Sequence, residues 1–258
     1  IKISLKKNLS ENNIKNYVLF TNEDFKISGL SNLSLNNYSA AITKTIKSQR
    51  FKKDSFLSFN LNPDQKIILV KLIKNLSASE IEKRGAKLYS FLKDNHIFEV
   101  TFLENNIKDS HYKNKNFLDE FLHGIHLKSY EFNKYKTKKK NYNLEIFISY
   151  KSKLFNFNNN KRYNSLVEGT NFTKDLVSEP GNILHPDEYA KRLTHLRKFG
   201  LKVTVYDEKK LRNMGMNALL GVGQGSIRGS YIVTIEWNGK KSNSKPLAFV
   251  GKGVCFDT

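Results

Sequence analysis

The side chains best suited to chemistry lie together in residues 251–258, GKGVCFDT. They follow a short apolar run, residues 247–250, which Pro246 introduces. An apolar run after a turn signal is typical of a buried strand in a parallel sheet. Ligands of open α/β sheets bind beyond the carboxyl ends of the strands. We therefore expect Lys252 and Asp257 to reach a binding or catalytic site.

Lys252 and Asp257 permit two chemical interpretations. One is a buried ion pair between the lysine and the aspartate at the end of the strand. The other is a metal site, because an aspartate at a strand end is a common metal ligand. A lysine beside divalent cations also shifts toward its neutral amine, which is the form that can coordinate a metal. The residue types alone leave both interpretations open.

Cys255 is the only cysteine in the sequence. A nucleophilic role is disfavoured, because no neighbouring feature argues for activation of its thiol. Its place between Val254 and Phe256 suits a small buried residue instead. With one cysteine, disulfides are not part of the design, so we expect a reducing, cytoplasmic setting.

Other candidate groups are weaker. Residues 221–226, GVGQGS, are rich in glycine but lack both the ending of a P-loop and the spacing of a dinucleotide-binding motif, so tight packing or a turn is the favoured interpretation. His123 and His126 are three residues apart on a predicted helix, yet the six histidines follow no metal-ligand motif. Surface or packing roles are therefore expected for the histidines.

The net charge of +20 suggests a polyanionic partner such as nucleic acid. Lysines outnumber arginines about five to one, however, whereas bidentate phosphate recognition favours arginine. Asn, Ile, Phe and Tyr are also abundant, so a bias toward A/T-rich codons is the favoured explanation. The densest basic run, residues 134–141, is interpreted as a solvated loop rather than a phosphate-binding patch. The interleaved rings of Tyr130, Phe132 and Tyr135 could stack on bases or anchor the loop to the core.

Strands alternate with helices along the whole chain, which predicts an α/β fold with a sheet flanked by helices. Ser77 or Ser79 followed by Glu80 or Glu82 predicts a capping box at one helix start. Strands are predicted at residues 17–20, 56–61, 66–73, 97–103, 144–148, 202–206, 231–237 and 247–250, and helices at residues 36–50, 77–94, 116–130, 165–179, 186–199 and 207–215.

Composition divides the chain into parts. We expect an α/β domain over residues 1–150, a polar linker over 151–164, and the beginning of a second α/β domain over 165–258. The sequence lacks a stretch of 18 apolar residues and a signal-peptide pattern at Ile1, so neither a membrane span nor secretion is predicted. The first residue is Ile1 and the last lies inside a motif, so we expect a piece of a longer chain.

Four stretches together resemble the leucine aminopeptidase (cytosol aminopeptidase) family. VGKGVCFDT, residues 250–258, is similar to the family's first metal-binding motif, with Cys255 where the family usually has threonine. NFTKDLVSEPGNILHPDEYA, residues 171–190, resembles the stretch before the catalytic domain, and GMNALLGVGQGS, residues 215–226, matches another family segment. SYEFNKYK, residues 129–136, resembles the end of the N-terminal domain.

The resemblance implies an N-terminal, macro-like α/β domain followed by the start of an α/β zinc-peptidase catalytic domain. It implies metal-dependent removal of N-terminal residues from peptides by a water that two Zn²⁺ or Mn²⁺ ions activate. Lys252 would ligate one ion and Asp257 would bridge both. The family is typically hexameric. The remaining ligands and the catalytic residues are expected after Thr258, so this chain alone is expected to be inactive.

Two other functions remain open for the N-terminal half. It could be a basic α/β module that binds a polyanion or a nucleotide, or it could serve mainly in oligomer assembly. No membrane partner is expected.

Overall fold

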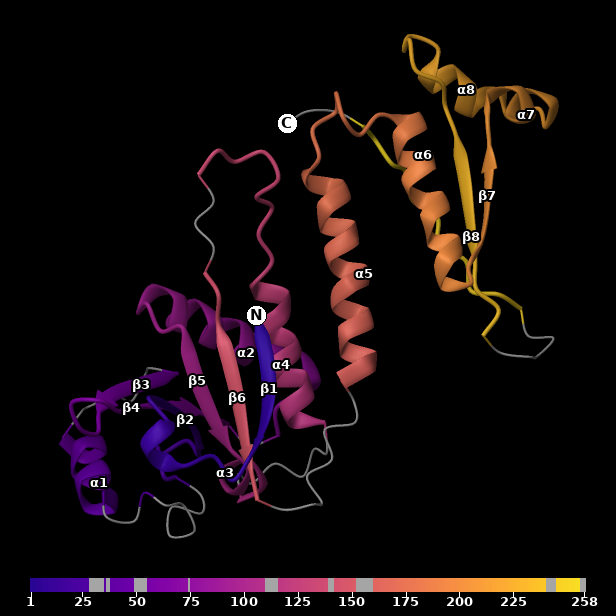
Figure 1. The fold of residues 1–258 in the computed structure, drawn as a ribbon. Helices are drawn as coiled ribbons and strands as arrows, with labels where there is room; N and C mark the ends of the chain where they lie inside the picture. The colour runs from indigo at the N-terminus through magenta and orange to yellow at the C-terminus, as the bar shows by residue number, and fades with distance from the viewer. Residues whose placement is uncertain are drawn as a thin grey trace. The chain divides into compact units, whose positions relative to one another are not determined.

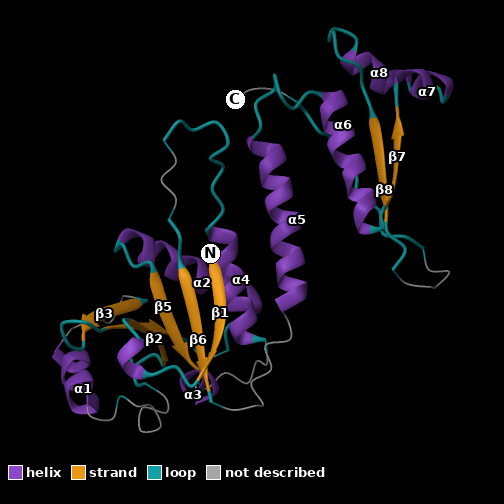
Figure 2. Cartoon of the chain, viewed as in Figure 1, coloured by secondary structure: helices purple, strands orange, loops and turns teal. Residues whose placement is uncertain are grey.

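The computed structural model describes residues 1–27, 35, 38–48, 55–73, 75–109, 116–138, 142–151, 160–239 and 245–255 (Figure 1). Contacts divide the chain into two compact units, Ile1–Asn171 and Phe172–Thr258. Both units combine helices and strands, so the predicted α/β class is confirmed (Figure 2). Of the predicted linker, residues 152–159 lie outside the described residues, and the chain is helical from Asn160.

The first unit is built on a six-stranded sheet in the order β1-β6-β5-β2-β4-β3. All neighbouring strands are parallel except β3 and β4, which are antiparallel. Its strands are β1 (Lys2–Lys7), β2 (Asn16–Thr21), β3 (Phe56–Asn60), β4 (Lys66–Lys71), β5 (Glu99–Leu103) and β6 (Glu145–Tyr150), and its helices are α1 (Ser39–Ser48), α2 (Ala78–Asp94), α3 (Glu104–Asp109), α4 (Phe117–Lys128) and the first part of α5 (Asn160–Ser178).

Apolar side chains fill both faces of this sheet, as expected for strands with few polar positions. In β4, Ile67 and Leu69 pack on one face, and Ile68 and Val70 pack on the other. Helices α2 and α4 cover the second face, where Phe20 lies within 5.6 Å of three other aromatic rings, measured between ring centroids. The predicted central strand at residues 66–73 therefore lies in the core.

Helix α2 begins where the sequence predicts it. The Ser77 side chain accepts a hydrogen bond from the Glu80 N–H, and the Glu80 carboxylate accepts one from the Ser77 N–H at 2.8 Å, so the predicted capping box is confirmed. The Ser77 hydroxyl also donates to the Glu80 carboxylate at 2.7 Å, and this bond together with that from the Ser77 N–H lowers the pKa of Glu80. The buried residues of α2 include Ile81, Gly85, Leu88 and Leu92, the four that the sequence pattern indicates.

The second unit is smaller and has little buried apolar surface. Its two strands, β7 (Lys202–Tyr206) and β8 (Ile232–Glu236), form an antiparallel pair against which α6 packs. Its helices are the rest of α5, α6 (Pro186–Thr194), α7 (Glu208–Asn213) and α8 (Asn217–Gly223), with a 3-10 helix over His195–Phe199. Asp207 caps α7 as predicted, accepting from the Lys210 N–H at 2.9 Å.

One strand and two α-helices of the described residues were not predicted. β1 is a lysine-rich edge strand, and charged edge strands carry a weak strand signal. α3 and α8 span only six and seven residues, too few to show a helical period. None of the helices in the described part of the chain is long and apolar enough to cross a membrane.

The predicted strand at residues 247–250 is wrong. Residues 245–255 make no strand pairing, and Leu247, Phe249 and Val250 are 81%, 89% and 99% exposed. An apolar run becomes a buried strand only when neighbouring strands and a covering layer exist. Among the described residues of the second unit only the β7–β8 pair forms a sheet, and it does not include this run.

Candidate functional site

Of the two candidate metal ligands, Lys252 and Asp257, only Lys252 lies among the described residues. Lys252 is exposed, in the extended segment 245–255. Asp257 lies outside the described residues, so no distance joins the two side chains. Across the described part of the chain, no three His, Cys, Asp or Glu side chains are grouped so that they could hold a metal ion.

Helix α6 fixes the path of the segment that carries Lys252. Gly253 lies against the ring of Tyr189, where an added Cβ would come within 2.6 Å of Cε1. A larger residue next to Lys252 would therefore require the Tyr189 ring of α6 to shift. Cys255 is half-buried, and burial together with the charge of Asp187 raises the pKa of its thiol. A raised pKa keeps the thiol protonated, which agrees with the disfavoured nucleophile role.

Charged side chains hold α6 itself in place. Glu179 is buried, and its Oε1 accepts a hydrogen bond from Arg192 Nη1 at 2.9 Å. Arg192 Nε also donates to Glu188 Oε1 at 3.0 Å, and both contacts raise the pKa of the guanidinium. At the start of the helix, His185 accepts from the Glu188 N–H at 3.4 Å. This network ties the end of α5 to α6, the helix that contacts Gly253.

Of the three glycines in residues 221–226, Gly223 alone lies in close contact with another residue, whereas nothing lies within 4 Å of the Cβ positions of Gly221 and Gly225. Gly223 ends α8, and an added Cβ there would lie 2.1 Å from Ser230 Oγ. A larger residue at this position would therefore require the Ser230 hydroxyl to rotate away.

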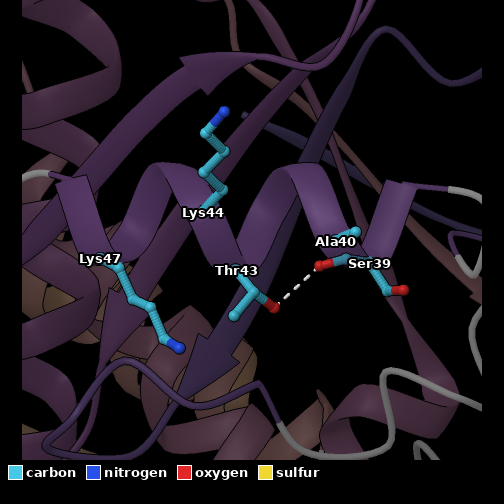
Figure 3. A pocket seen from close by; sticks show the side chains of 5 residues that line it. All are labelled: Ser39, Ala40, Thr43, Lys44 and Lys47. Atoms are coloured by element: carbon cyan, nitrogen blue, oxygen red, sulfur yellow. Dashed lines mark hydrogen bonds between the residues drawn. The ribbon is translucent and has the colours of Figure 1, made fainter.

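A surface hollow of about 460 Å³ lies along α1, lined by Ser39, Ala40, Thr43, Lys44 and Lys47 (Figure 3). The Thr43 hydroxyl donates to the Ser39 carbonyl at 2.8 Å. Lys44 and Lys47 leave the helix in opposite directions (Figure 3). Its polar groups therefore do not converge on one ligand position.

The end of the sheet where a nucleotide would bind is filled by the chain itself. Strand β2 pairs with β5 only at Tyr17 and Val18, and β5 then gives way to α3. Beyond this point the buried side chain of Asn106 in α3 makes the hydrogen bonds to β2 that a neighbouring strand would make. Its Oδ1 accepts from the Phe20 N–H at 2.7 Å, and its Nδ2 donates to the Phe20 carbonyl at 3.1 Å. Asn106 therefore occupies the place beside Phe20 where a neighbouring strand would otherwise make these hydrogen bonds.

A buried polar cluster on α4 includes His123, one of the candidate groups considered from the sequence, and acidic residues that were not singled out from it. His123 Nδ1 lies 2.8 Å from Glu82 Oε1 of α2, and the ring of Tyr163 from α5 lies 5.0 Å from the His123 ring. Asp119 and Glu120 are also buried, and burial with the neighbouring Glu120 charge raises the pKa of Asp119 to about 6. Burial also raises the pKa of Tyr163, as do the charges of these carboxylates. In the sequence, only the spacing of Asp119, Glu120 and His123 on one helix could have indicated this cluster.

Asp119→Asn is expected to stabilise the protein at neutral pH. The carboxyl binds its proton more tightly in the folded state, where its pKa is about 6, than in an unfolded chain, where it is about 4. Its contribution is therefore most favourable below pH 4 and declines as pH rises toward 6. The variant should gain about 1–2 kcal/mol in free energy of unfolding at pH 7.5 and nothing at pH 4. Urea unfolding at the two pH values measures this.

The exposed Asp64 provides the matched control for Asp119. Asp64→Asn should change the free energy of unfolding by less than about 0.5 kcal/mol at either pH. A destabilised Asp119→Asn variant at pH 7.5 would show that the Asp119 carboxylate is favourably paired.

Comparison with known proteins identifies a family that the second half of the chain resembles. Residues 171–258 match the profile described as cytosol aminopeptidase family, catalytic domain. Proteins described as probable cytosol aminopeptidases are 42% identical over 134 residues in a Bradyrhizobium strain and 46% identical over 131 residues in Phytoplasma mali. The first alignment covers 50% of this chain and 27% of the relative, and the second covers 50% and 26%.

Solved structures share the fold at low sequence identity. A tomato leucine aminopeptidase variant aligns with 91% of this chain and 50% of its own, at a TM-score of 0.69 and 18% identity. A cytosol aminopeptidase from Coxiella burnetii aligns with 92% of this chain and 47% of its own, at a TM-score of 0.63 and 18% identity. The bottromycin maturation enzyme BotP, solved in complex with Mn, covers 87% of this chain and 45% of its own, at a TM-score of 0.60 and 15% identity. The chain thus spans about half the length of these structures.

Proposed function

We propose that this chain, whose residues 171–258 match the catalytic-domain profile of the cytosol aminopeptidase family, is part of a metal-dependent aminopeptidase. Its reaction would release N-terminal amino acids, leucine among them, from peptides. The observation that carries this proposal is the match of residues 171–258 to the catalytic-domain profile, which includes the sequence VGKGVCFDT.

Lys252 and Asp257 are the residues that would hold metal. A carboxylate and a neutral amine are donors that suit Zn²⁺ or Mn²⁺, so the two side chains fit such ions by type. A pair of bound ions supplies Lewis acidity toward the scissile carbonyl and toward an attacking water. Lys252 stands on the surface where additional polypeptide can reach it, with Gly253 holding the neighbouring backbone close to Tyr189.

Lys252 and Asp257 are only two ligands, and two ligands cannot fix a two-metal site. The other ligands and the catalytic groups would come from polypeptide beyond the half that this chain shares with the solved relatives. We propose a homo-hexamer for the complete protein, peptides as its substrates and the cytoplasm as its location. These follow from the family resemblance.

The test is hydrolysis of leucine p-nitroanilide by a protein that carries this chain together with a complete catalytic domain. A chelator should remove the activity, and added Zn²⁺ or Mn²⁺ should restore it, because the ions supply the Lewis acid. Residues 1–258 alone should show no hydrolysis above the uncatalysed rate. Hydrolysis that persists in chelator would refute the metal dependence, and hydrolysis by residues 1–258 would refute the incomplete site.

A further inference from the structure

The loop between α4 and β6 carries a concentrated positive charge. Residues 130–138, here named the lysine arm, extend beyond the ends of the neighbouring strands of the sheet (Figures 1 and 2). Lys134, Lys136 and Lys138 are exposed on it. No acidic residue occurs between Phe132 and Lys138. The arm therefore presents three ammonium groups to solvent at alternate positions of the chain.

The base of the lysine arm is fixed to the first unit. The Glu131 carboxylate forms an ion pair with Lys93 of α2 and accepts a hydrogen bond from Asn133 at 3.1 Å. These contacts lower the pKa of Glu131 and raise that of Lys93. The Lys136 N–H donates to the Asn133 carbonyl at 3.4 Å, which closes a turn. The three lysines thus lie on a loop that contains a hydrogen-bonded turn and is attached to α2 through Glu131.

The sequence leaves open whether the aromatic rings of the lysine arm stack on bases or anchor the loop to the core. Tyr135 is 50% exposed, so about half of its surface is open to solvent. Its ring packs edge-on against Phe132, with centroids 5.8 Å apart, and the Lys134 ammonium lies 5.3 Å from its centroid. Tyr142, beyond the arm, packs against the core instead. Tyr135 therefore offers ring surface to an outside partner.

We propose that the lysine arm binds single-stranded nucleic acid. Ammonium groups on a loop pair with successive phosphates, and an exposed tyrosine between them stacks on an unpaired base. Stacking needs a base that is not paired, which selects a single strand over a duplex. The two lysines beside the α1 hollow have no exposed ring between them and point apart, so they lack this combination (Figure 3).

Fluorescence anisotropy with a labelled oligothymidylate of about 20 nucleotides tests the proposal on residues 1–258. The variant Lys134→Gln/Lys136→Gln/Lys138→Gln should bind at least tenfold more weakly near 0.1 M salt. Its plot of log affinity against log salt should be shallower by about 2, because each phosphate that a lysine neutralises accounts for roughly 0.7 of the slope. Tyr135→Ala should weaken binding about tenfold without changing this slope.

A matched control removes the same charge elsewhere. Lys15, Lys44 and Lys47 are exposed in the same unit, and their triple glutamine variant should bind within threefold of the parent. Equal losses of affinity in the two triple variants would overturn the proposal in favour of a diffuse electrostatic field. It would also be overturned if the parent did not bind at 0.05 M salt, or if a duplex of the same length bound as tightly. Unchanged thermal midpoints would show that the arm variants fold.

Discussion

Replacing Asp257 or Lys252 by alanine is expected to reduce aminopeptidase activity by a factor on the order of 10³ or more. Each change removes a proposed metal ligand, and bound metal contributes several kcal/mol of charge stabilisation to hydrolysis, with a tenfold rate for each 1.36 kcal/mol. Steady-state hydrolysis of leucine p-nitroanilide, in a protein with a complete catalytic domain, measures the loss. Lys252→Arg should fail as well, because a guanidinium keeps the charge but cannot coordinate.

Two neighbours of the proposed ligands serve as controls. Lys245 is an exposed lysine of the same segment, and Lys245→Ala should keep activity within about twofold. Cys255→Thr installs the residue usual in the family at a position without a ligand role and should also remain active. Full activity of Lys252→Ala and Asp257→Ala would show that the site assignment is wrong.

Gly124→Ala is expected to destabilise the first unit by about 3 kcal/mol or more. Helices α2 and α4 touch through their backbones: a Cβ on Gly124 would lie 1.9 Å from the Glu82 carbonyl oxygen, and one on Gly85 would lie 1.9 Å from the Phe121 carbonyl oxygen. Backbone atoms cannot rotate away, so the helices must separate and open the core they share. Urea unfolding followed by far-ultraviolet circular dichroism should show a lower midpoint.

Gly169→Ala is the matched helical control. Gly169 lies in α5, and nothing lies within 4 Å of the position its Cβ would take. Alanine has the higher helix propensity, so this variant should be stabilised by up to about 1 kcal/mol. A Gly124→Ala variant that is as stable as Gly169→Ala would contradict the close backbone contact.

Sequence patterns predicted the elements whose local signals agree with their packing. Helix α2 has both a capping box and a regular apolar face, and the strands from β2 to β8 consist of short apolar runs between turns. Tertiary contacts decide the rest. The short helix α3 is stabilised by Asn106, which hydrogen-bonds to Phe20 of β2. Residues 247–250 are unpaired because no described strand lies beside them.

The candidate site was predictable only in its residue types. Composition left an ion pair and a metal site equally open for Lys252, and the family resemblance favoured metal. The Asp119 and His123 cluster gave no clear signal, because its burial depends on α2 and α5, which are distant in sequence. The exposure of Tyr135 likewise depends on how the α4–β6 loop leaves the sheet.

Metal content is the most direct test of the proposed site. We expect a protein with a complete catalytic domain to retain about two Zn²⁺ or Mn²⁺ ions per chain after dialysis, as a two-metal hydrolase requires. Asp257→Ala should lose at least one of them, and Lys245→Ala should lose none. Equal metal contents in the parent and in Asp257→Ala would contradict the assignment of Asp257 as a bridging ligand.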